Sequence, residues 1–318
     1  MSLHKSAQGA IPRALLVAVL ALAPARLGRS WGNQAHQMVN AMAVENLPEP
    51  LRSYFRARKT YLVEHASDPD QLAGDNPRER SHHYTDPEAY DRDPFPILKK
   101  QFVDQRRGPT QFEIRHGDSI WQIEKFTDEL ADDLRRGQWS GADRAAVFAA
   151  HYACDLTQPL HTVLNYDGQF TRQAGIHSRF ETEMVDTLKD GWVIKPLPAV
   201  DEVNLRARIF RELLSSYHQS KAVFAADRNA VAGRTYVDPG FFPAFEKLAG
   251  PIAEKQLDDA VSFVSSVWYT AWVRAGKPAL PHCRPARRCA VNRKPATDRS
   301  APPTEKGRAR QISFEVVQ

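Results

Sequence analysis

The sequence lacks a hydrophobic run that is long enough to cross a membrane comfortably as a helix, and its mean hydropathy is -0.50. These two features exclude a polytopic membrane protein. The sequence also has no sustained strand-like alternation, no internal repeat, no glycine-rich phosphate-binding loop and no serine nucleophile in a convincing context. It has only three cysteines: Cys283 and Cys289 are candidates for a disulfide in an oxidising compartment, and Cys154 is expected to be a buried thiol.

What the sequence does have is helical periodicity over most of residues 31–280. Apolar residues recur at spacings of three and four, and charged ends followed by glycine, as in RRG and KDG, suit helix C-caps. With 42% hydrophobic residues the chain can bury a sizeable core. We therefore predict an all-α fold, a single helical bundle domain over residues 31–280. The predicted helices are 36–47, 118–137, 142–156, 176–191, 201–219 and 252–276.

Residues 1–30 have the layout of a secretory signal peptide. Lys5 and Arg13 precede the apolar run ALLVAVLALA, and the small residues of LGRS precede Trp31. An uncleaved signal anchor is the alternative, but the apolar run is short for a membrane span. We therefore expect a secreted or periplasmic protein whose mature chain begins at Trp31.

The net charge of +5 belongs to the ends of the chain. Residues 1–30 contribute +4 and residues 283–318 contribute +6, so residues 31–282 carry −5. A body of that sign offers no general basic footprint for duplex nucleic acid. The segment 281–318 is rich in proline, arginine and lysine and has no apolar periodicity, which predicts a disordered basic tail.

The stretch HYACDLTQPLH places three good metal ligands around the end of an apolar helix. His151 and Asp155 are four residues apart, so on a helix they project from one face. Pro159 disfavours helix at the residue before it, so His161 is expected on the turn just past the helix end. A lone pair of this kind also occurs as a hydrogen-bonded couple in a protein core, and the third ligand is what favours a metal site.

Candidate ligands occur in three further blocks. The first is at the predicted mature start, the second is in a long irregular stretch at about 57–117 that we expect to be functional, and the third repeats the spacing of four on another helix. The residues are Trp31 and His36 in WGNQAH; Asp68, Asp70, His82, His83 and Asp86 in HASDPDQ and HHYTD; and His177 and Glu181 in GIHSRFE.

In combination and order, these blocks resemble one superfamily: the zinc-dependent bacterial phospholipases C and the fungal and plant single-strand nucleases that share their all-α fold. The resemblance covers residues 31 to about 190 and is most specific in HYACDLTQPLH. It implies three zinc ions in a cleft. One zinc would be held by Asp70, His83, His151 and Asp155; a second by His161, His177 and Glu181; and the third by the amino nitrogen and carbonyl oxygen of Trp31, with His36 and the bridging Asp155.

Two of these ligands are chosen between neighbours. Asp70 is preferred to Asp68 because it stands in the PDQ context, although the loop length to His83 varies among relatives. His83 is preferred to His82 because the family motif has an aspartate three residues after the ligand, which here is Asp86.

The predicted chemistry follows from the metals. Zinc lowers the pKa of a bound water toward about 7, so a nucleophile for in-line attack on phosphorus is available at neutral pH. By the resemblance, Asp70 orients or deprotonates this water and Asp155 bridges two ions, so these two are the predicted catalytic residues. Cleavage before Trp31 would free an amino group with an ordinary pKa of about 7.7–8.0 and complete the third site.

The sequence features that bear on the substrate point in two directions. GIHSRFE, with glutamate as the last ligand and VDTLKD after it, looks more like the phospholipases C. The gap from Trp31 to His36 looks more like the nucleases, and Tyr84 and Asp86 stand where those enzymes stack and hydrogen-bond a base. The acidic body and the lack of an arginine after PDQ argue against nucleic acid.

A phospholipase C acting on a phospholipid head group is therefore preferred. A single-strand-specific endonuclease or 3'-nucleotidase on DNA or RNA is the alternative. A helical metal-binding protein without catalysis is a third hypothesis. No stable protein partner is implied, and a monomer is expected.

Overall fold

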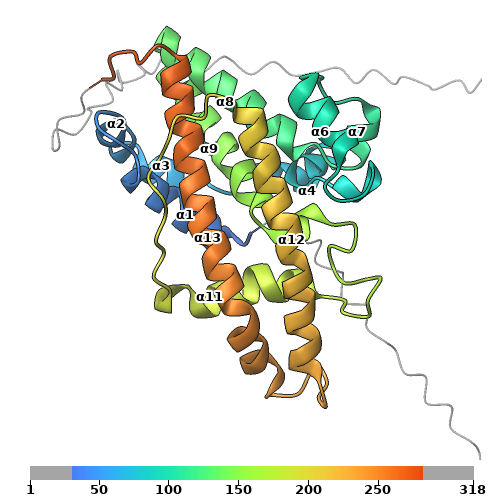
Figure 1. Cartoon of the computed structure of the whole chain (residues 1–318). Coiled ribbons are helices and arrows are strands. Elements are labelled where there is room, and N and C mark those ends of the chain that lie inside the picture. The colour runs from blue at the N-terminus through green and yellow to red at the C-terminus, as the bar shows by residue number, and fades with distance from the viewer. Residues whose placement is uncertain (1–30, 282–318) are drawn as a thin grey trace, which may run out of the picture. The chain divides into compact units, whose positions relative to one another are not determined.

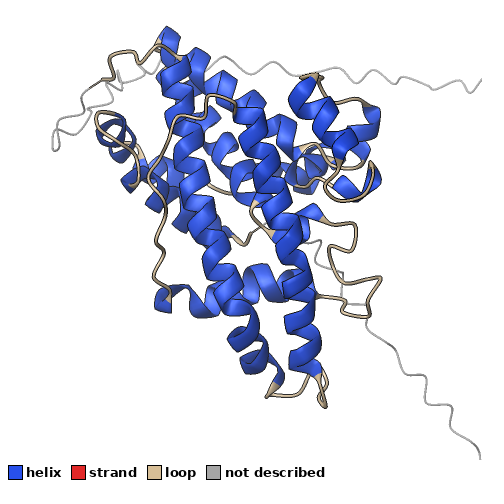
Figure 2. Ribbon diagram, viewed as in Figure 1, coloured by secondary structure: helices blue, strands red, loops and turns tan. Residues whose placement is uncertain are grey.

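The computed structural model describes residues 31–281, except for the side chain of Asp75. The predicted signal peptide and the predicted basic tail, with Cys283 and Cys289, lie outside the described residues. Within the described range every regular element is a helix (Figure 2), which confirms the predicted all-α fold. None of these helices is both long and apolar enough to pass through a membrane.

Long helices form the body of the fold (Figure 1). α8 (Ser119–Arg136) packs along α9 (Trp139–Leu156), and α13 (Phe241–Arg274) packs against both of them and against α12 (Leu205–Val231). α1 (Asn33–Glu45) lies against α13 and also reaches α9. The hydrophobic core is therefore continuous among these five helices.

α9 is the central helix of the bundle. All of its residues from 145 to 156 are buried, so the polar side chains on its last turns are held inside the protein. A 3-10 turn, Pro159–Thr162, follows the helix. The side chain of Gln158, the residue before this turn, accepts a hydrogen bond from the backbone N–H of Leu160. His161 lies on this turn, where its position relative to Pro159 predicted it.

The stretch predicted as irregular, about 57–117, contains a series of short helices. Several of them have a proline as their first or second residue, which suits the first turn of a helix because an N–H at that position has no partner within the helix. Single short helices leave little periodicity in a sequence, so the pattern of the stretch resembled a loop. The short elements are α2 (Leu51–Arg56), α3 (Lys59–Glu64), α4 (Asp68–Asp75), α5 (Pro77–Arg80), 3-10 turns at Ser81–His83 and Pro87–Ala89, α6 (Pro96–Lys99), a π-helical turn at Lys100–Asp104, and α7 (Gln111–Arg115).

The predicted helix over 176–191 is divided in the structure. It consists of α10 (Ile176–Ser178), a π-helical turn (Arg179–Glu183), α11 (Met184–Leu188) and a 3-10 turn (Lys189–Gly191). α12 and α13 are longer than predicted, and α13 continues through Pro251. The last helix was predicted to begin at residue 252, just after this proline, because a proline inside a helix removes one backbone hydrogen bond.

An extended segment after residue 191 is fastened along α13. Its backbone N–H groups donate hydrogen bonds to polar side chains spaced every four residues on the helix, at distances from 2.6 to 3.2 Å. This ladder fixes the segment that leaves α11 and leads to α12. The acceptors on α13 are Glu254, Asp258, Ser262, Ser266 and Thr270.

Candidate metal centre

Asp155 is the centre of the candidate site. It lies in the last turn of α9 with no exposed surface, and histidines from three elements face its two oxygens. Oδ1 is 3.3 Å from Nε2 of His36, and Oδ2 is 3.0 Å from Nδ1 of His83 and 3.3 Å from Nε2 of His151. The rings of His36 and His151 stack with centroids 4.0 Å apart. One carboxylate therefore joins α1, the turn at residues 81–83 and α9.

Asp70, from α4, completes a first group with His83 and His151. Its Oδ1 is 3.6 Å from Nδ1 of His83 and 3.6 Å from Nε2 of His151. Those two nitrogens are 3.1 Å apart. The stretch at about 57–117 thus brings Asp70 and His83 to the face of α9 that carries His151 and Asp155.

His161, His177 and Glu181 form a second group. Nε2 of His177 is 2.9 Å and Nε2 of His161 is 3.5 Å from Oε2 of Glu181, and the two Nε2 atoms are 3.2 Å apart. Nδ1 of His161 also lies 4.0 Å from Oδ1 of Asp155, so the second group adjoins the first.

Backbone carbonyls orient three of the histidines. Nδ1 of His151 is 2.8 Å from the carbonyl oxygen of Ala66, Nδ1 of His161 is 2.8 Å from that of His83, and Nδ1 of His177 is 3.1 Å from that of Tyr166. A carbonyl only accepts, so each Nδ1 carries the hydrogen and each Nε2 presents a lone pair to its group in the neutral ring. This is the arrangement that metal-binding histidines commonly have.

The carboxylates are ionised because the imidazoles surround them. Burial raises the pKa of Asp155, but His151, His36 and His83 lower it by more, and it lies well below its usual range. Burial lowers the pKa of His151, but Asp155 and Asp70 raise it to about 9. Burial, together with His151, lowers the pKa of His36. Without a metal ion, positive charge beside Asp155 is therefore held as a proton on His151.

This set of donors fits zinc. Imidazole nitrogens and carboxylate oxygens are ligands that zinc takes in proteins, three or four at a time. Nε2 of His83 is buried and has no hydrogen-bond partner among the described residues, and Oδ1 of the buried Asp155 faces only the imidazoles of His36 at 3.3 Å and His161 at 4.0 Å. In each of three groups, one ligand atom from every residue lies within 4.8 Å of the others. The groups are His36, His151 and Asp155; Asp70, His83 and His151; and His161, His177 and Glu181.

The structure separates the neighbours between which the sequence offered a choice. Asp68 lies outside the groups and its Oδ2 is 2.8 Å from Nδ1 of His65. His82 points away from them, with Nδ1 2.6 Å from Oδ1 of the buried Asp118. Asp70 and His83 are the members of each pair that lie beside Asp155.

The side chain of Trp31 packs against Thr157, the residue after α9, and Phe180, the residue before Glu181. The indole is fully buried, its Nε1 donates a hydrogen bond to Oγ1 of Thr157 at 3.4 Å, and its ring centroid is 5.7 Å from that of Phe180. α1 begins two residues later and carries His36 to Asp155. The backbone of residue 31 therefore lies near the end of α9 that carries the candidate ligands.

Tyr84 and Asp86 follow His83 at the edge of the site. Both are partly exposed, and the N–H of Asp86 donates to the carbonyl of His116 at 2.8 Å. Burial, with a smaller effect of Glu88, raises the pKa of Asp86 to about 7. Neither side chain belongs to the three candidate ligand groups.

Gln158 is a site residue that sequence reasoning missed. Its Nε2 donates to Oε2 of Glu181 at 3.0 Å, while its Oε1 accepts from the N–H of Leu160 at 2.6 Å. It thereby orients Glu181 and the turn that carries His161. The signal in the sequence that could have identified Gln158 is its position between Asp155 and His161, two predicted ligands of the same motif.

Comparison with known proteins identifies the family. A search of curated proteins found no match. The model of the S1/P1 nuclease family matches residues 31–240, a range that includes every candidate ligand. The chain therefore belongs to the S1/P1 nuclease family and is a phosphodiester hydrolase.

Proposed function

We propose that the chain is an exported, zinc-dependent phosphodiesterase that cleaves single-stranded DNA or RNA. The family match over residues 31–240 carries this proposal. The candidate ligands would hold about three zinc ions with three or four ligands each, in the sets that the resemblance implies. The amino group of Trp31 would be a ligand once the preceding residues are removed.

The residues of the site divide the work of phosphodiester hydrolysis. Bound zinc would lower the pKa of water toward about 7 and neutralise phosphate oxygens. Burial raises the pKa of Asp70, but His151 and other neighbours lower it to about 2, so at neutral pH this carboxylate can orient a water by accepting its hydrogen. Asp155 would bridge the two halves of the cluster, and Gln158 would keep Glu181 in place.

The surroundings of the site favour a single strand as substrate. Tyr84 and Tyr166 are close enough to interact electrostatically, and the ring of Tyr166, which is 52% exposed, lies 5.9 Å from that of His177. Aromatic rings of this kind can stack a base, which contributes about 1–3 kcal/mol. All the candidate ligand side chains except that of Asp70 are buried, so a phosphodiester in a flexible single strand can reach them more readily than one held in a duplex.

Phospholipase C activity is the second candidate, because Glu181 and the VDTLKD segment match that branch of the resemblance. Purified mature protein should be assayed in parallel on denatured DNA, on duplex DNA and on phosphatidylcholine. We expect turnover of denatured DNA well above that of the duplex. Turnover of phosphatidylcholine alone would reject the nuclease and support the second candidate.

Metal content tests the cofactor directly. We expect protein purified without chelator to contain about three equivalents of zinc, because the candidate ligands form three groups. Elemental analysis of the mature chain measures this number. A value below two equivalents would contradict the cluster, and removal of zinc by a chelator should abolish hydrolysis until zinc is restored.

Asp86→Asn should separate substrate binding from stability. The pKa of Asp86 is about 7 in the folded protein and has the ordinary value of 3.8 in the unfolded chain. Between these two pH values the folded state binds more protons than the unfolded state, so the free energy of unfolding falls as the pH rises. The variant lacks this penalty, so we expect its Tm to exceed that of the wild type at pH 8 and by less at pH 5. Loss of the hydrogen bond to a base should lower kcat/KM on denatured DNA about 10-fold.

Thermal melts at the two pH values, with kinetics at pH 8, make this measurement. Tyr84→Phe is the matched control at the same edge, because it keeps the ring and leaves the carboxyl of Asp86 in place. An equal Tm gain at pH 5 and pH 8 would contradict the raised pKa, and unchanged kcat/KM would remove Asp86 from substrate binding.

A further inference from the structure

Two ligands of the second group, His177 and Glu181, stand on a helical stretch that contains a π-helical turn. His177 lies in α10, which has three residues, and Glu181 lies in the π-helical turn that follows. π-helical turns are rare and often lie at functional sites, and this one continues directly into α11. Because the turn departs from the regular α-helical hydrogen-bond pattern, contacts with the rest of the protein are needed to fix the geometry of His177 and Glu181.

Arg179, midway between these two ligands, points away from them and makes such contacts. Its Nη2 donates to Oδ1 of Asp227 at 2.9 Å and to the carbonyl of Gln173 at 3.1 Å, and its Nη1 donates to the carbonyl of Ala174 at 2.9 Å. The guanidinium lies 4.2 Å from the ring centroid of Tyr236. The guanidinium is thus held by a carboxylate, two carbonyls and an aromatic ring.

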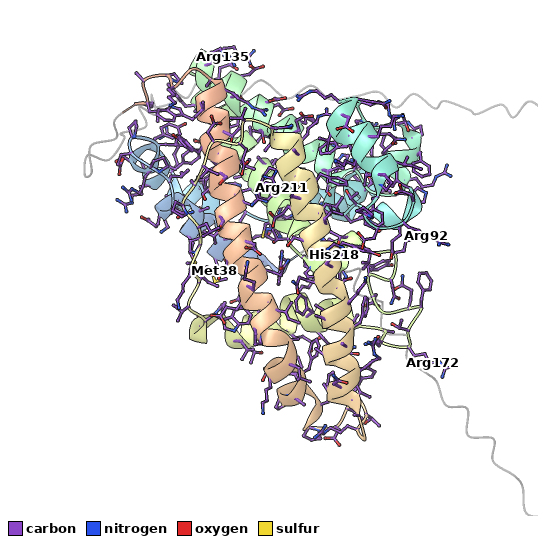
Figure 3. All side chains as sticks on the ribbon, viewed as in Figure 1. Met38, Arg92, Arg135, Arg172, Arg211 and His218 are labelled. Atoms are coloured by element: carbon purple, nitrogen blue, oxygen red, sulfur yellow. The ribbon has the colours of Figure 1, made fainter. Side chains whose placement is uncertain are left out.

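Asp227 gathers three segments at one carboxylate. It is fully buried on α12 and accepts hydrogen bonds at Oδ2 from Nε2 of Gln173 at 2.9 Å and from the hydroxyl of Tyr236 at 2.8 Å. The loop before α10, the π-helical turn and the connection between α12 and α13 all meet there. By contrast Arg172, next to Gln173, extends away from the protein (Figure 3).

The loop before α10 is shaped for this contact. Gly175 has φ +84, and a Cβ there would stand 2.8 Å from Nη1 of Arg179. Oδ1 of Asp167 accepts hydrogen bonds from the N–H groups of Gly175 at 3.0 Å and His177 at 3.3 Å. The Arg179 contact and the His177 backbone are therefore fixed by the same few residues.

We infer that the Arg179–Asp227 pair is a positioning device for the second metal site, the one formed by His161, His177 and Glu181. The hydrogen bonds of the pair go to Gln173, Ala174 and Tyr236 and not to these ligands, and the first group stands on other elements, namely α4, the turn at residues 81–83 and α9. Loss of the pair should loosen the second site and leave the first unchanged. The inference rests on the proposed zinc binding.

Arg179→Lys tests the inference in the full mature chain. Lysine keeps the charge, but its single ammonium cannot reach Asp227 and two carbonyls together. Metal-free protein is titrated with zinc against a competing chromophoric chelator. We expect the Kd of one equivalent to rise about 10- to 100-fold, and those of the others to stay unchanged. Tyr236→Phe removes one hydrogen bond to Asp227 and should give a smaller change in the same equivalent.

The chain offers a matched control in Arg206. Its guanidinium binds both oxygens of Glu124, donates to the carbonyls of Phe102 and Arg107, and lies 4.9 Å from the ring centroid of Phe102. It therefore has the same kind of buried environment without contact to a candidate ligand. Arg206→Lys should lower Tm to a similar extent and leave every zinc Kd unchanged.

Combination with His161→Ala shows which equivalent is affected. If Arg179 acts through the second site, Arg179→Lys adds no further loss to His161→Ala but adds fully to Asp70→Asn. Zinc constants of Arg179→Lys that match those of Arg206→Lys, or an equal weakening of all equivalents, would overturn the inference. A wild-type protein that binds no zinc would instead overturn the proposed function.

Discussion

Asp155→Asn is expected to lower phosphodiester hydrolysis by at least about 10³-fold and to reduce the zinc content by one equivalent or more. An amide has nearly the shape of the carboxylate but no charge, so it cannot bridge two cations. The side chain of Asp155 has no exposed surface and lies between His36, His83 and His151. Solvent therefore cannot reach this position and compensate for the lost charge. Zinc analysis and single-turnover kinetics on denatured DNA measure both effects.

Asp68→Asn is the matched control for this prediction. Asp68 is near the cluster in sequence and spatially pairs with His65, outside all three ligand groups. We expect normal zinc content and nearly normal rates from it. If Asp68→Asn were inactive and Asp155→Asn active, the assignment of both carboxylates would be wrong.

The effect on the histidines gives a second measurement. Burial lowers the pKa of His151, and Asp155 and Asp70 together raise it to about 9. In metal-free Asp155→Asn, one of these two charges is gone, so the pKa of His151 should fall. NMR titration of the histidines in the metal-free wild type and variant would detect the fall, and an unchanged value would show that Asp155 does not interact with this ring.

The sequence made the central helix predictable because its signals are local. The spacing of His151 and Asp155 places them on one face of any helix. Pro159 ends the helix through a local steric effect that does not depend on how the bundle packs. The choices of Asp70 over Asp68 and of His83 over His82 needed the family resemblance, since the two members of each pair have the same side chain. In the structure Asp70 and His83, the residues chosen, lie beside Asp155. Their role as metal ligands stays a prediction.

The supporting contacts could not be predicted, for two physical reasons. Carbonyl oxygens such as those of Ala66 and Tyr166, which orient His151 and His177, belong to the backbone and leave no mark on residue types. The partner of Arg179 is 48 residues away, and helical periodicity shows which face is buried but not what covers it. The π-helical turn was missed because one extra residue per turn hardly changes an apolar pattern.

The start of the mature chain should also have a large effect on activity, second to that of Asp155. The indole of Trp31 is buried against Thr157 and Phe180, and an added Cβ on Gly32 would lie 3.3 Å from Oγ1 of Thr182, next to Glu181. This tight packing holds the backbone of residue 31 in one place. If cleavage occurs before Trp31, its amino group is a candidate zinc ligand beside His36.

One extra residue before Trp31 would convert this amine into an amide nitrogen, which is a poor zinc ligand at neutral pH. The other two sites do not use it, so we expect the extended protein to fold, to retain about two zinc ions and to lose at least about 100-fold in rate. N-terminal mass spectrometry, zinc analysis and turnover of denatured DNA should be compared for both forms. A matched extension at the C-terminus controls for the added residue. Full activity with an intact N-terminal extension would remove Trp31 from the site and leave a two-metal enzyme in which cleavage serves export alone.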